Sequence, residues 1–133
     1  MKKGYHGNIE EAAVANTHFR HVIYTAKDCQ LVLMSLLPGE EIGMETHTEG
    51  DQFFRFERGT GKVMIDESVY EVADGDAIIV PMGARHNVIN TSPSEALKIY
   101  TIYAPPHHRD GISRATKAEA EADGPEFDGV TTE

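Results

Sequence analysis

Short hydrophobic runs alternate with turn sequences between Phe19 and Tyr103. The runs are rich in Val, Ile, Tyr and Phe, which favour strands over helices. They are separated by the turn sequences Pro38-Gly39, Gly59-Thr60-Gly61, Asp74-Gly75, Pro81-Met82-Gly83 and Thr91-Ser92-Pro93. The pattern predicts strands at 19–25, 30–37, 42–48, 51–58, 62–66, 69–73, 77–80, 86–90 and 96–103. Many short strands with closely spaced turns are typical of an all-β sandwich or barrel.

The two ends of the chain have a different pattern. Asn8 followed by Glu11 is typical of a capped helix start, so we expect a short N-terminal helix through residues 12–14. After Pro105 and Pro106 the chain leaves the sheet; residues 114–123 favour one weak acidic helix, and 124–133 favour disorder. The sequence therefore predicts an N-terminal extension (1–18), one barrel domain (19–106) and a partly disordered acidic tail (107–133).

Composition limits the function classes. The chain has 133 residues, 40% hydrophobic and 26% charged, as in ordinary soluble globular domains. Its net charge of −10 comes with no basic stripe, which disfavours a nucleic-acid partner. No apolar run is long enough to span a membrane, and the N-terminus lacks the apolar core of a signal peptide. The single Cys29 excludes an internal disulfide, so we expect a cytoplasmic protein.

Candidate chemistry lies in the stretch from Glu45 to Gln52. Residues two apart in a strand share a face, so Glu45 and His47 point together. A turn at Gly50 brings Gln52 onto a neighbouring strand, and His86 follows a Pro-x-Gly turn. Two imidazoles, a carboxylate and an amide oxygen suit Mn, Fe, Ni or Zn. The alternative is a hydrogen-bonded polar rim without metal.

Two sequence motifs resemble those of the cupin family of small β-barrels. The second cupin motif, G-x5-P-x-G-x2-H-x3-N, is matched throughout by Gly75, Pro81, Gly83, His86 and Asn90. The first, G-x5-H-x-H-x3-4-E-x6-G, is matched by Gly39, His47 and Gly59. The resemblance covers about residues 30–106 and is closest to small single-domain cupins of the cupin-2 or mannose-6-phosphate-isomerase-like type. It implies a double-stranded β-helix, or jelly-roll barrel, often dimeric and holding a divalent transition metal.

The resemblance also implies a ligand set. The family's metal ligands fall at Glu45, His47, Gln52 and His86, of which only the two histidines keep the family's residue type. Gln52 removes one negative charge from the family's set, and Glu45 restores it. Some small sugar-processing cupins also carry glutamine at the position of Gln52, which makes an amide ligand credible.

A metal-dependent enzyme is the first functional hypothesis. The metal would hold adjacent oxygens of a small sugar, sugar acid or hydroxy or keto acid, while Glu45 or His107 moves a proton in an isomerase-type reaction. We expect the substrate pocket to be lined by Phe54, Phe56 and Tyr103.

Two alternatives stay open. The first is an Fe- or Mn-dependent cupin oxygenase, in which Glu45 must act as the base because the Gln52 amide has no useful pKa. The second is a non-catalytic cupin that binds a small ligand. In each case we expect a homodimer, with Phe53 on the outer face of the sheet as an interface candidate.

Overall fold

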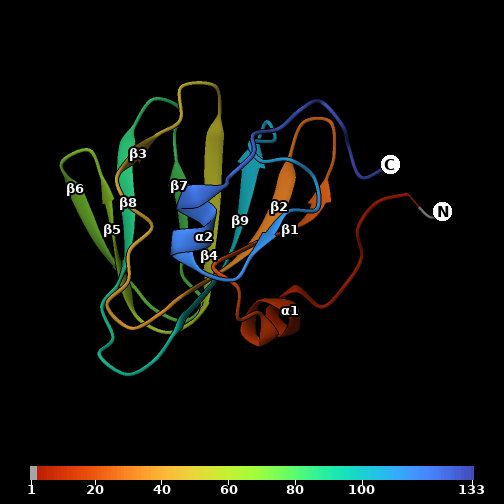
Figure 1. Ribbon diagram of the computed structural model, residues 1–133. Helices are drawn as coiled ribbons and strands as arrows, with labels where there is room; N and C mark the ends of the chain where they lie inside the picture. Colours follow the sequence, from red (N-terminus) through yellow and green to blue (C-terminus); the bar gives the residue numbers. More distant parts are fainter. Residues whose placement is uncertain (1–2) are drawn as a thin grey trace.

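The computed structural model describes residues 3–133 as two antiparallel sheets that face each other (Figure 1). The larger sheet has the order β10-β1-β2-β9-β4-β7, and the smaller has the order β3-β8-β5-β6. The strands of the larger sheet are β10 (Ser113–Arg114), β1 (Arg20–Thr25), β2 (Gln30–Leu36), β9 (Leu97–Ala104), β4 (Asp51–Arg58) and β7 (Ala77–Val80). Those of the smaller sheet are β3 (Glu45–Thr46), β8 (Arg85–Asn90), β5 (Gly61–Ile65) and β6 (Ser68–Val72).

The alternation of residues along each strand explains why the two sheets pack together. In β4, Phe54 and Phe56 are buried between the sheets, while Phe53 and Arg55 point to the outer face. Strand β9 lies beside β4 and buries every second residue, beginning at Leu97. The core is therefore the space between the two sheets. The predicted all-β jelly-roll fold is confirmed.

Strand β3 is shorter than the sequence predicts. Strand pairing was expected over 42–48, but only Glu45 and Thr46 pair with β8. Gly43 has φ 111°, which interrupts the extended ladder, although the Ile42 N–H still donates to the Val88 carbonyl oxygen at 2.9 Å. The two-residue β10, which pairs with β1, was not expected.

Two short helices lie outside the sheets (Figure 1). Helix α1 (Ile9–Ala15) begins as predicted, because the Asn8 side chain accepts a hydrogen bond from the Glu11 N–H at 3.0 Å. Helix α2 (Lys117–Ala122) begins with a capping box formed by Thr116 and Glu119. No helix in residues 3–133 is long and apolar enough to cross a membrane.

The last ten residues, for which the sequence favours disorder, pack on the barrel instead. The Phe127 N–H donates to the His107 carbonyl oxygen at 3.1 Å, and the Thr132 N–H donates to that of Thr25 at 2.9 Å. These hydrogen bonds join segments far apart in sequence, so the polar composition of the tail gives no sign of them. The predicted homodimer stays a prediction.

Gly83 provides a test of the fold. It has φ 86°, and the position that a Cβ would occupy is open, so a substitution is resisted by backbone strain rather than by crowding. We expect Gly83→Val to lower the free energy of unfolding by about 1–2 kcal/mol or more. Gly83→Asn should cost less, because Asn tolerates positive φ. Urea unfolding of both variants measures the difference; equal losses would contradict the strain argument.

Candidate metal centre

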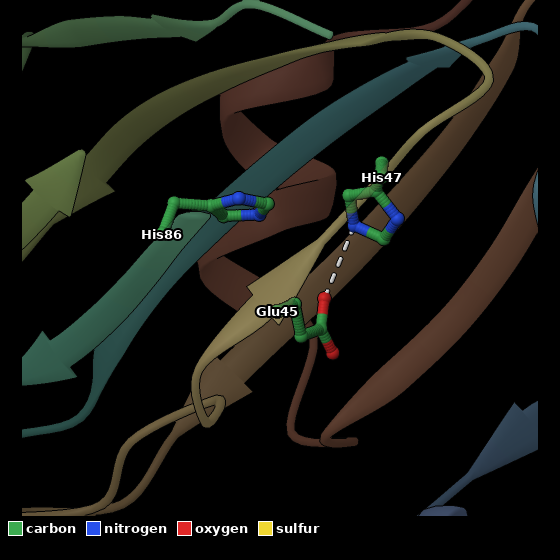
Figure 2. Close-up of side chains that lie close together, drawn as sticks. All are labelled: Glu45, His47 and His86. Carbon is green, nitrogen blue, oxygen red and sulfur yellow. Dashed lines mark ion pairs between the residues drawn. The ribbon is translucent and has the colours of Figure 1, made fainter. Parts of the chain in front are cut away.

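The side chains of Glu45, His86 and His47 converge (Figure 2); the first two lie on strands of the smaller sheet, and His47 lies just after β3. Glu45 on β3 lies directly opposite His86 on β8 in the antiparallel register. His47 follows two residues after Glu45 and so returns to the same side of the chain. One ligand atom from each of these residues lies within 4.8 Å of the others. The spacing is small enough for the three side chains to hold a single ion.

The nitrogens of the two histidines are available as ligands. His86 Nδ1 lies 3.1 Å from the Ala84 carbonyl oxygen, and only an N–H group can donate to a carbonyl. Nε2 of His86 therefore carries the lone pair, and this buried atom has no hydrogen-bond partner in residues 3–133. His47 Nε2 lies 3.1 Å from Glu45 Oε2 but also lacks a hydrogen-bond partner of good geometry. The hydrogen bond from His86 Nδ1 to a backbone carbonyl is of the kind that commonly orients metal-binding histidines, leaving the other nitrogen free for the metal.

Gln52 offers an oxygen from the opposite sheet. The Thr101 hydroxyl donates to the Phe53 carbonyl oxygen at 2.8 Å, so it can only accept from Gln52, whose Nε2 lies 3.0 Å away. This arrangement fixes the orientation of the Gln52 amide. Its Oε1 atom is buried and has no hydrogen-bond partner among the described residues. A buried oxygen without a donor is suited to an ion or a bound ligand.

The charges of the site favour the protonation states that a cation needs. Burial alone raises the pKa of Glu45, but the contact with His47 and the nearby charge of Arg20 outweigh it, so the pKa lies below its ordinary value. Burial lowers the pKa of His86, and the Ala84 carbonyl opposes this only in part. At neutral pH the site therefore presents a carboxylate and a neutral imidazole.

A cavity of about 350 Å³ opens beside this site. It is lined by the β3–β4 loop, by the end of β9 and by the tail at Glu126 and Phe127. His107 belongs to its wall: its ring centroid lies 4.6 Å from that of His47 and 5.2 Å from that of Tyr103, on which it stacks. The structure therefore brings His107 and Tyr103, both singled out from the sequence, close to His47 of the candidate metal centre.

Phe54 and Phe56 do not line this cavity, contrary to the expected apolar wall. Both are at most 1% exposed and belong to the core, with the Phe54 ring centroid 6.5 Å from that of His86. They follow Gln52 along β4 and so lie deeper between the sheets than the level of the site. Tyr103, on β9, is paired with Gln52 itself and reaches the cavity.

Sequence reasoning missed the residues that support His107. Gln30, fully buried on β2, accepts from the N–H groups of His107 and His108 and donates to the His108 carbonyl oxygen at 2.7 Å. His108 is 6% exposed, and its Nε2 lies 3.3 Å from the Tyr103 hydroxyl. In the sequence, the only indication of this support was a glutamine, Gln30, at the start of a hydrophobic run. Its partners become visible only when the strands are assembled.

A double-stranded β-helix with a Glu/His/His set between its sheets defines a cupin barrel. In agreement, residues 32–103 match the family model described as Cupin_2, cupin domain. The chain belongs to the cupin family, as the two sequence motifs predict. Structural similarity extends beyond the barrel: the crystal structure of BH2720 from Bacillus halodurans has a TM-score of 0.89 and 41% identity, covering 91% of this chain and 96% of that one.

Two curated relatives are similar in sequence. YrkC, an uncharacterized protein of Bacillus subtilis (strain 168), is 46% identical over 121 residues, covering 86% of this chain and 64% of YrkC. L612, an uncharacterized protein of Acanthamoeba polyphaga mimivirus, is 39% identical over 107 residues, covering 78% of this chain and 67% of L612. The chain thus spans about two thirds of the length of these relatives.

The buried His108 predicts how stability depends on pH. Burial lowers its pKa from 6.5 to about 2, helped by the charge of Arg20. Below pH 6.5 the unfolded chain binds a proton that the folded chain does not, so stability falls as the pH falls. The expected contribution is about 1.4 kcal/mol per pH unit well below that value.

We expect His108→Gln to remove this contribution. Its free energy of unfolding should fall less steeply than that of the parent between about pH 6 and pH 4.5, measured by urea unfolding. His6→Gln, at an exposed histidine, is the control and should keep the parent slope. If His108→Gln kept the pH dependence of the parent, His108 would not be held neutral in the folded chain.

Proposed function

We propose that Glu45, His47 and His86 bind one divalent transition metal, with Gln52 Oε1 as a fourth, neutral ligand. The observation that supports this most strongly is the set of buried atoms without hydrogen-bond partners: His47 Nε2, His86 Nε2 and Gln52 Oε1. Burying three such atoms is costly unless an ion satisfies them. The proposed set contains two imidazoles, one carboxylate and one amide oxygen, which suits Mn, Fe, Ni or Zn.

The chemistry that follows is an isomerase-type proton transfer on a small oxygenated molecule. A divalent metal supplies positive charge that stabilises the negative charge developing on substrate oxygens when a neighbouring C–H is deprotonated. The cavity of about 350 Å³ is of a size for a sugar, a sugar acid or a hydroxy or keto acid.

Of the two proton carriers suggested by the sequence, His107 suits the role better than Glu45. Glu45 is already engaged with His47 at 3.1 Å and is needed as the anionic ligand. His107 lies on the cavity wall, and Gln30 holds its backbone N–H at 3.2 Å. Burial lowers the pKa of His107, and the neighbouring His47 adds to the effect, so the ring is neutral and able to accept a proton at neutral pH.

The metal site is tested by exchanging its two unusual ligands. Glu45→Gln leaves two imidazoles and two amides with no anion, so we expect the purified protein to lose most of its metal. Gln52→Ala removes only a neutral oxygen and should weaken metal binding by about tenfold or less. Elemental analysis and metal titration of both variants, loaded side by side with the parent, measure the difference.

Glu49→Gln is the matched control, because Glu49 lines the cavity but does not belong to the three-residue cluster. It should keep the metal content of the parent. Full metal in Glu45→Gln with loss in Gln52→Ala would show that the ligand roles are assigned wrongly. If the parent itself holds no metal after loading with Mn, Fe, Ni or Zn, the proposal fails.

The proton-transfer role is tested with His107→Gln. Glutamine keeps a hydrogen-bonding group but cannot carry a proton at neutral pH, so we expect a loss of about 100-fold in deuterium exchange into a keto-sugar or hydroxy acid. Metal content should match the parent, which separates this role from metal binding. An unchanged exchange rate would rule out His107. Oxygen consumption without exchange would instead favour the oxygenase.

A further inference from the structure

A second cavity of about 310 Å³ is lined in part by Glu45. Its wall is built by the chain from Ile42 to Glu45, by the start of β1 and by α2, which contributes Lys117. We call it the side cavity. The cavity of about 350 Å³ that contains His47 and His107 is the outer cavity. Glu45 lines the side cavity with Arg20 and lies 3.1 Å from His47, which lines the outer cavity.

Arg20 is the unusual residue of the side cavity. It lies on β1 and is only 8% exposed, yet its Nε has no hydrogen-bond partner in residues 3–133. No carboxylate of those residues forms a salt bridge with its guanidinium. The Phe19 ring lies 5.5 Å away, but a cation–π contact is weaker than an ion pair. A buried guanidinium without an ion-pair partner is costly, and Arg20 lines a space large enough to admit an anion.

We propose that the side cavity binds a small carboxylate, held by the guanidinium of Arg20. A planar guanidinium matches the two oxygens of a carboxylate, which it can hold by two parallel hydrogen bonds. A singly charged ligand suits the site better than a phosphate dianion, because Glu45 and Glu121 also line the cavity. Lys117 adds positive charge but lies 3.9 Å from Glu121, with which it is paired.

The outer cavity has a more negative lining than the side cavity. Glu49, Asp51 and Glu126 line it, and its lining contains no Lys or Arg. A carboxylate therefore finds favourable charge in the side cavity rather than at the outer opening. Because Glu45, a proposed metal ligand, lines the side cavity together with Arg20, a hydroxy or keto acid could place its carboxylate on Arg20 and its second oxygen on the metal. This last step rests on the proposed function, whereas the carboxylate site does not.

The carboxylate site is tested first in metal-free protein. Acetate is titrated against chloride at constant ionic strength, and binding is followed by NMR at the Arg20 Nε–H and at the backbone amides of Gly43 and Met44. We expect saturable shifts at all three positions. Arg20→Gln should weaken acetate binding by about tenfold or more, from the loss of a charge-assisted hydrogen bond. Arg58→Gln, at an exposed arginine, should bind as the parent does.

Absence of saturable shifts in the parent, or parent affinity in Arg20→Gln, would overturn the proposal. Should Arg20→Gln fail to fold, the parent's own Arg20 Nε–H resonance decides, since it must respond to acetate and not to chloride. A second titration compares acetate with glycolate in metal-loaded protein. Tighter binding of glycolate only when metal is present assigns the site to a substrate that spans both groups. Equal binding assigns it to a separate carboxylate ligand and leaves the metal proposal unaffected.

Discussion

The pairing of Glu45 with His86 across β3 and β8 is the constraint on which the metal centre depends. Strand β3 has only two paired residues, so other contacts must hold it in register. The Gly83 N–H donates to the His47 carbonyl oxygen at 2.8 Å, and the Gly43 N–H donates to the Asn87 side chain at 2.9 Å. The turn before His86 therefore fixes the position of His47. In this way the second cupin motif positions a proposed ligand that belongs to the first.

Strands β4 and β9 of the opposite sheet contribute rigidity rather than further charge. Gln52 and Tyr103 are paired across β4 and β9, and Thr101 fixes the Gln52 amide through a chain of two hydrogen bonds. Burial raises the pKa of Tyr103 far above its ordinary value, and the charge of Glu45 adds to this, so the hydroxyl stays protonated. Strands β4 and β9 thus present neutral groups, and Glu45 is left as the negative charge of the three-residue cluster.

Much of the fold and part of the site could be predicted from the sequence, because the relevant signals are local. Strand parity places Glu45 and His47 on one side, and the spacing of the second motif identifies His86. The residues that were missed depend on non-local pairing. Gln30 on β2 accepts hydrogen bonds from the backbone of His107 and His108. The charge of Arg20 on β1 lowers the pKa of Glu45 only because the two sheets face each other. The polar composition of the tail gave no indication of the hydrogen bonds that join the tail to the barrel.

Charge balance connects the metal centre with the side cavity. With a divalent metal in place, Glu45 would be one carboxylate against three positive charges, two on the metal and one on Arg20. Lys117 and Glu121 lie 3.9 Å apart and offset each other. Excess positive charge in a poorly solvated interior is unfavourable, and a bound carboxylate reduces it. Glu45 replaces the family's motif-one histidine, and Gln52 replaces its glutamate. This exchange keeps the charge of the proposed ligand set but moves the negative charge next to the side cavity. A ligand that brings its own negative charge to Arg20 lowers the excess from two positive charges to one, which the four proposed ligands alone do not achieve.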